Sequence, residues 1–300
     1  MATTFKALTD ADRASTRTLL HEAVPITGTI LSGTYTSNGN IKNYSHGMFQ
    51  SVYDYPYLSS SANHIFDITA GYSAKSAYSA SANNQNAKKI NIYNEMAQIL
   101  VGFDHTGSIR EFDQDGDLSG GSKIQEGVFI NFARLLTKDE IKKSSFTMSL
   151  ATGGTTTAPD FGNLKTISDY GATTKYKVNS PAGEYGILYT GSEALAGTGV
   201  GLIYYQAGIA LITGSVFYPR TAPFAAFGDS GAVYDTRTFD VVLTGSQISA
   251  SAEGFRNRVY NVAFDNTTEL NSTIYFCRAH HNDFNYSSNP TYLAGSKVVV

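Results

Sequence analysis

The sequence predicts a mainly β fold with a few short helices (α+β), built on a β-sandwich or barrel-like core with long loops. The chain of 300 residues contains 20 Tyr, 17 Phe and 28 Gly. Aromatic and β-branched residues suit pleated, half-buried surfaces, and Gly marks tight turns. Short alternating runs bounded by Gly and Asn recur, as in residues 27–35 before the turn at 37–40. This length also permits a substantial core.

Two helices are expected within this β-rich chain. Residues 9–22 can form a short helix, with Thr9 or Asp10 as its N-cap and Leu and Ala on one side. Residues 86–100 place Ile, Tyr, Met and Leu at helical spacing, and Gly102 can end that helix.

The chain is expected to divide near residue 160. Residues 1–160 are predicted to form an N-terminal mixed α/β region, and residues 161–300 a C-terminal β-rich domain. The loose segment 153–165, rich in Thr and containing Pro159, is the candidate boundary.

An uncharged run over residues 194–217 has the length of a membrane span. Five glycines interrupt it, whereas a spanning helix needs about 20 continuously apolar residues. Residues 200–205 and 209–217 instead predict a buried hairpin around the turn at 206–208.

Charge and cysteine usage narrow the function classes. The net charge is -3 and only 16% of residues are charged, which argues against nucleic-acid binding through clustered Lys and Arg. The single cysteine, Cys277, excludes an intrachain disulfide and a multi-cysteine metal site, and it is expected to be a packed side chain. The first ten residues contain no apolar signal region, so Sec-type secretion is not expected.

Residues 228–231 read Gly-Asp-Ser-Gly, the sequence around the nucleophile of chymotrypsin-like proteases. The order His64, Asp104, Ser230 would match that triad. However, His64 lacks the sequence context of the protease histidine. The segment most similar to that context, residues 69–72, has Tyr72 at the position where the histidine is needed. A β-turn at Ser230 is the favoured interpretation, and no catalytic residues are predicted.

Two further groups resemble metal ligands. Asp113, Asp115 and Asp117 alternate as at the start of a calcium loop, but Gly and Glu are absent from the sixth and twelfth positions of that motif. A solvated acidic turn is the favoured interpretation, with structural Ca²⁺ as the alternative. His280 and His281 are adjacent and favour surface or interface contacts over chelation. No metal and no cofactor are therefore predicted.

The C-terminal third resembles virion structural proteins of T4-like contractile-tailed bacteriophages, in particular the marine and cyanophage group. The resemblance lies in Gly-Glu-Tyr-Gly-Ile-Leu-Tyr at 183–189, in the hairpin at 201–214, and above all in residues 271–293. That last segment reads Asn-Ser-Thr-Ile-Tyr-Phe-Cys-Arg and continues to Phe-Asn-Tyr-Ser-Ser-Asn-Pro-Thr at 284–291.

The resemblance implies a non-enzymatic structural subunit of the virion, located in the tail or baseplate and assembled in the bacterial cytoplasm. The expected partners are other virion proteins and copies of the same chain in a symmetric homo-oligomer, with neither nucleic acid nor membrane. The alternatives are a head or neck protein, a glycan-binding adhesin and, last, the Ser230 protease. The expected interface residues are Phe284, Asn285, Tyr286, Asn289, Pro290 and Tyr292.

Overall fold

The computed structural model describes residues 8–26, 39–82, 84–154, 159–191, 199–217, 248–277, 293–294 and 297–298. Its elements follow one another along the chain with these bounds: η1 Asp10–Asp12, β1 Arg13–Ile26, β2 Ile41–Asn43, β3 Gln50–Tyr53, β4 His64–Tyr72, α2 Asn86–Leu100, β5 Phe112–Asp113, β6 Lys123–Ile124, β7 Glu126–Phe132, α3 Arg134–Thr137, β8 Glu140–Ile141, β9 Thr147–Gly154, β10 Pro159–Ser168, α4 Ala172–Lys175, β11 Tyr185–Thr190, β12 Gly201–Tyr204, β13 Ile209–Ile212, η2 Gly214–Phe217, α7 Ile248–Arg256, β14 Val259–Tyr275, β15 Leu293–Ala294 and β16 Lys297–Val298.

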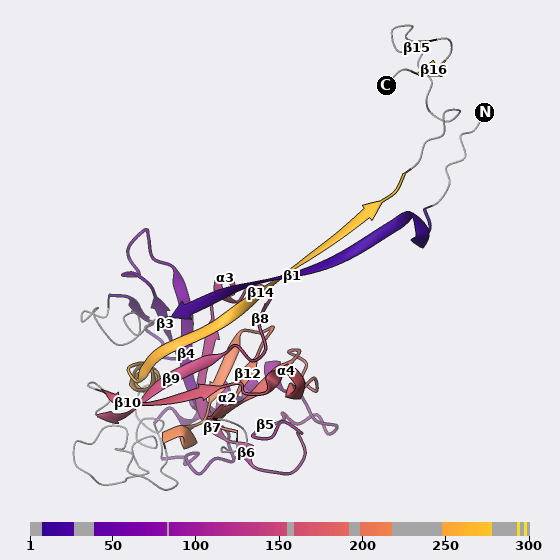
Figure 1. The fold of residues 1–300 in the computed structure, drawn as a ribbon. Helices are drawn as coiled ribbons and strands as arrows, with labels where there is room; N and C mark the ends of the chain where they lie inside the picture. The colour runs from indigo at the N-terminus through magenta and orange to yellow at the C-terminus, as the bar shows by residue number, and fades with distance from the viewer. Residues whose placement is uncertain are drawn as a thin grey trace. The chain divides into compact units, whose positions relative to one another are not determined.

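One large antiparallel sheet dominates the fold, which confirms the predicted mainly β class (Figure 1). Its strand order is β1-β14-β9-β10-β11-β12-β13-β7-β4-β3-β2, with β8 also paired to β14. Short hairpins build most of it, because consecutive antiparallel strands need only tight turns. The predicted hairpin is confirmed: β12 pairs with β13 from Gly201 opposite Ile212 to Tyr204 opposite Ile209.

The sheet curves back on itself around an aromatic centre. Phe132 of β7 and Phe264 of β14 lie six places apart in the strand order, yet their ring centroids are 5.2 Å apart. Phe132 also contacts the rings of Phe66 and Phe146. The short strand β8 contributes to the closure, because Ile141 pairs with β14 and donates its N–H to the Tyr205 carbonyl. The core is therefore barrel-like.

The central strands are buried on both faces. In β7, Val128, Ile130 and Phe132 face the inner cluster, whereas Phe129 faces a second cluster on the outside. Strands β12 and β13 alternate in the same way, as the two-residue period of a strand requires.

Helix α2 covers this outer face and confirms the prediction for residues 86–100. It contributes to the outer cluster the buried side chains of Ile92, Tyr93, Ala97 and Leu100. Gly102, at φ +79°, ends the helix by donating its N–H to the Ala97 carbonyl.

The helix predicted for residues 9–22 is wrong. Only η1 is helical there, and β1 follows it from Arg13 to Ile26. Asp12 caps the start of this turn by accepting hydrogen bonds from the Thr9 N–H and hydroxyl. Beyond that turn, Thr16 and Thr18 are β-branched residues two positions apart, which favours a strand once a partner strand is available. Helix α7, in the C-terminal half, was not predicted.

The described chain forms two compact units. One contains residues 1–20 and 269–300, and the other contains residues 21–268. This division differs from the expected one, and β10 runs across the expected boundary at residue 160.

Among the described residues, no helix combines the length and the apolar character needed to cross a membrane.

Candidate functional site: an exposed two-stranded ribbon

The sequence-predicted site residues fall mostly outside the described part of the chain. This applies to the six expected interface residues between Phe284 and Tyr292, and also to Ser230, His280 and His281. Cys277 is described and is exposed, so the expectation that it is a packed side chain is wrong.

His64 and Asp104 do not form the beginning of a protease triad. The His64 ring nitrogen Nε2 lies 2.9 Å from Asp67 Oδ1, and that same oxygen accepts a hydrogen bond from the Ser51 hydroxyl. Asp104 accepts its hydrogen bonds within its own turn, from Thr106 and Ser108. The Ser51 hydroxyl therefore donates to the Asp67 carboxylate and not to a ring nitrogen of His64, so these three residues do not reproduce the order of hydrogen bonds in a protease triad.

The described surface does contain one unusual feature, formed by residues 13–20 of β1 and 269–275 of β14. We call these residues the ribbon. The Phe276 N–H donates to the Asp12 carbonyl at 2.7 Å, and the Ser15 and Thr273 hydroxyls lie 3.1 Å apart. Residue numbers thus rise along one strand as they fall along the other, so the two strands are antiparallel (Figure 1).

Side chains alternate between the two faces of this ribbon. The contact between Ser15 and Thr273 defines one face, which also carries an ion pair between Arg17 and Glu269 at 2.5 Å. This charged face consists of Arg13, Ser15, Arg17, Leu19, Glu269, Asn271, Thr273 and Tyr275. The uncharged face consists of Ala14, Thr16, Thr18, Leu20, Leu270, Ser272 and Ile274.

The uncharged face leaves large apolar side chains in water. Leu20 and Leu270 are each 51% exposed and Ile274 is 53% exposed. In the described residues, this part of β14 pairs with no strand other than β1. An isolated pair of strands is marginally stable in water, so covering the uncharged face would stabilise the ribbon.

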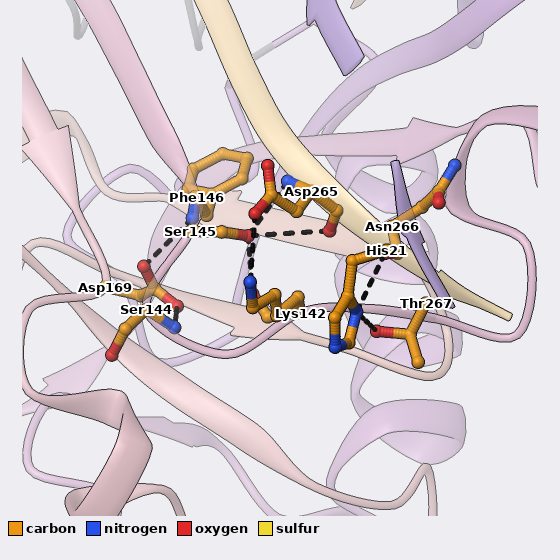
Figure 2. Close-up of polar contacts among 9 residues, drawn as sticks. All are labelled: His21, Lys142, Ser144, Ser145, Phe146, Asp169, Asp265, Asn266 and Thr267. Carbon is orange, nitrogen blue, oxygen red and sulfur yellow. Dashed lines mark hydrogen bonds and ion pairs between the residues drawn. The ribbon is translucent and has the colours of Figure 1, made fainter. Parts of the chain in front are cut away.

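Within the unit of residues 21–268, a polar cluster holds β14 against the rest of the sheet (Figure 2). The Ser145 hydroxyl donates to the Lys142 carbonyl at 2.6 Å and accepts the Asp265 N–H at 3.0 Å. The Lys142 ammonium pairs with the Asp265 carboxylate at 3.2 Å. His21 Nδ1 lies 3.2 Å from the Thr267 hydroxyl, which links β1 to the same part of β14.

A buried carboxylate shapes the loop that carries Ser145. Asp169 is 1% exposed and accepts hydrogen bonds from the Ser144 and Phe146 N–H groups at 2.7 and 3.1 Å (Figure 2). The Tyr205 hydroxyl donates to it at 2.9 Å. Burial raises the pKa of the Asp169 carboxyl to about 6, although these hydrogen bonds favour the charged form.

Within the unit of residues 21–268, the cluster fixes residues 265–267 of β14 to the loop at 142–145 and to His21 of β1. Its groups are engaged with one another in hydrogen bonds or an ion pair. The resemblance drew attention to residues 271–275 of β14, but no local pattern in the sequence indicated their pairing with β1.

No family model matches the chain, and comparisons with curated proteins and with solved structures find no match. The assignment of a function therefore depends on the residues and their geometry.

Proposed function

We propose that this chain is a structural subunit of a tailed-bacteriophage virion, located in the tail or baseplate, which acts through static, multivalent protein–protein contacts. The observation that carries the proposal is the ribbon, whose uncharged face exposes Leu20, Leu270 and Ile274. The resemblance of residues 271–293 to phage virion proteins supports the same conclusion from the sequence, and part of that segment is the β14 half of the ribbon.

The partner chemistry follows from the composition of this face. Charged residues are depleted at the centre of protein interfaces, and the uncharged face carries none. Burying the exposed halves of its three large side chains contributes about 1 kcal/mol each, or about 3 kcal/mol per ribbon. This contribution is small for one pair of proteins, but in a symmetric assembly it is repeated at every copy.

The residues predicted as an interface, Phe284, Asn285, Tyr286, Asn289, Pro290 and Tyr292, follow β14 in the sequence. We propose that they also take part in intermolecular contacts. The partners are then neighbouring copies of this chain and other virion proteins.

A pair of matched variants tests the role of the ribbon. Ile274→Asp adds a charge to the uncharged face, and Thr273→Asp adds the same charge to the opposite face one residue away. Burying an unpaired carboxylate in an interface is costly, so Ile274→Asp is expected to abolish incorporation into particles, whereas Thr273→Asp is expected to incorporate normally. Circular dichroism of both purified variants controls for folding. Equal incorporation of the two folded variants would show that the uncharged face is not an interface.

Microscopy tests the location within the particle. Negative-stain images of virions labelled with an antibody against this chain are expected to show label on the tail or baseplate. Label on heads alone would instead support the head or neck alternative, and an unlabelled particle would remove the virion assignment.

A further inference from the structure

The hairpin of β5 and β6 encloses a loop, residues 114–122, in which three carboxylates converge. Asp113, Asp115 and Asp117 each place an oxygen within 4.8 Å of the others. The Leu118 N–H donates to Asp113 Oδ2 at 2.8 Å, so the chain wraps around the first of these side chains. Leu118 itself has φ +61°, at the sixth position from Asp113, where calcium loops make their sharp turn.

One carboxylate oxygen in this group is buried without a partner, and this observation is independent of the clustering. Asp113 is 1% exposed, and its Oδ1 has no hydrogen-bond donor among the described residues. Lys123 lies 3.1 Å from the other oxygen, Oδ2, and supplies one positive charge against three negative charges. Leaving a buried charged oxygen unpaired is costly in free energy, so this site favours a further cation.

The geometry around Gly121 shows where that oxygen points. A Cβ placed on Gly121 would lie 3.6 Å from Asp113 Oδ1 and 3.3 Å from Asp115 Oδ2. The unpartnered oxygen of Asp113 and a carboxylate oxygen of Asp115 therefore face the same side of the loop, next to a residue without a side chain.

We propose that this loop binds a calcium ion through the carboxylates of Asp113, Asp115 and Asp117. All three donors are hard oxygen ligands at alternate positions, which is the ligand pattern that Ca²⁺ takes in loops. Mg²⁺ is less suited, because it usually keeps several waters and binds only one or two carboxylates.

The ion would have a structural role, because the loop is attached to the core. The Gly116 carbonyl accepts hydrogen bonds from the Tyr185 hydroxyl at 3.0 Å and from the Asn179 amide at 3.1 Å. Tyr185 in turn stacks on Tyr204, with ring centroids 5.0 Å apart. Fixing the loop would therefore stabilise the outer face of the sheet.

Thermal unfolding of the full chain in Ca²⁺ and in EGTA tests the proposal. The expected result is a midpoint raised by about 5 °C when Ca²⁺ is at ~100 times its Kd. Asp115→Asn is expected to remove this shift. The matched control is Asp104→Asn, since Asp104 is also a carboxylate that accepts N–H groups within an exposed turn but is not one of the three converging carboxylates.

Direct binding gives a second measurement. The chain has no Trp, so Tb³⁺ emission excited through tyrosine reports an ion near Tyr185. This emission is expected in the wild type and in Asp104→Asn, to be lost in Asp115→Asn and Asp117→Asn, and to be displaced by Ca²⁺ but not by equal Mg²⁺. The proposal is overturned if millimolar Ca²⁺ leaves the wild-type midpoint unchanged, or if Asp115→Asn and Asp117→Asn both keep the shift and the emission.

Discussion

Replacing Asp169 with Asn removes a buried negative charge while keeping nearly the same side-chain shape. In the wild type, this carboxylate accepts the N–H groups of Ser144 and Phe146 and the hydroxyl of Tyr205. An Asn amide has one acceptor oxygen, so its NH₂ group must face at least one of these donors. That mismatch costs about 1–3 kcal/mol, and because Asn does not titrate, the cost is the same at every pH.

The pH dependence gives the more specific prediction. Burial raises the pKa of the Asp169 carboxyl from 3.8 to about 6. Between these values the folded state binds more protons than the unfolded state, so the free energy of unfolding falls as the pH rises. The contribution is fully present below the unfolded pKa and is lost as the pH rises through the folded pKa. At about 1.4 kcal/mol per pKa unit, the loss between pH 4.5 and 7.5 is about 2 kcal/mol.

Guanidinium chloride unfolding at several pH values, followed by circular dichroism, measures this effect. Subtracting the unfolding free energy of Asp169→Asn from that of the wild type cancels the other titrating groups. The difference is expected to favour the wild type by about 2 kcal/mol more at pH 4.5 than at pH 7.5. A difference that stays constant over this range, or grows with pH, would refute the assignment of a raised pKa to this carboxyl.

Three further predictions concern the core and one surface pair. Phe132→Ala is expected to cost about 3–5 kcal/mol of unfolding free energy, whereas the exposed Phe103→Ala should stay within about 0.5 kcal/mol; chemical denaturation measures both. Gly201→Ala places a Cβ 2.3 Å from a backbone carbonyl oxygen of β13 and should cost about 1–3 kcal/mol, and an unchanged melting temperature would contradict this close approach. The hydrogen bond with Asp67 raises the pKa of His64, so the pair stabilises the fold most below pH 6.5 and less as the pH rises through the folded pKa. An NMR titration should find the His64 pKa lower in Asp67→Asn than in the wild type, and equal values would contradict the pairing.

The sequence was most informative where local pattern and tertiary structure agree. The run of Ile, Tyr, Met and Leu in residues 86–100 has one apolar side, and α2 buries that side against the sheet. The hairpin at β12 and β13 could be predicted because two apolar runs flank a turn at Gly208, which has φ +68°.

Pairing between strands far apart in the sequence explains why a helix was wrongly predicted for residues 9–22. Residues 13–22 contain Leu, Ala and Thr in an order that fits a helix about as well as a strand. Their strand conformation depends on a partner some 258 residues away along the chain, as the contact between Ser15 and Thr273 shows. A local pattern contains no information about such a partner.

The candidate sites were only partly predictable for a related reason. The alternating positions of Asp113, Asp115 and Asp117 are visible in the sequence, but the burial of Asp113 and the position of Lys123 depend on the hairpin. Likewise, nothing near Asp169 in the sequence indicates that Tyr205 donates to it. Such contacts arise from the packing of separate strands.

The pairing of β1 with β14 also sets the order of events during synthesis. The ribosome releases β1 first and must add about 250 further residues before β14 emerges, which takes roughly 10–50 s at 5–20 residues per second. During that time the ribbon cannot form, and its uncharged face does not yet exist as a surface. A chain truncated before β14 would lack this surface altogether. Under the proposed function, only chains whose translation has proceeded through β14 would present this surface for assembly.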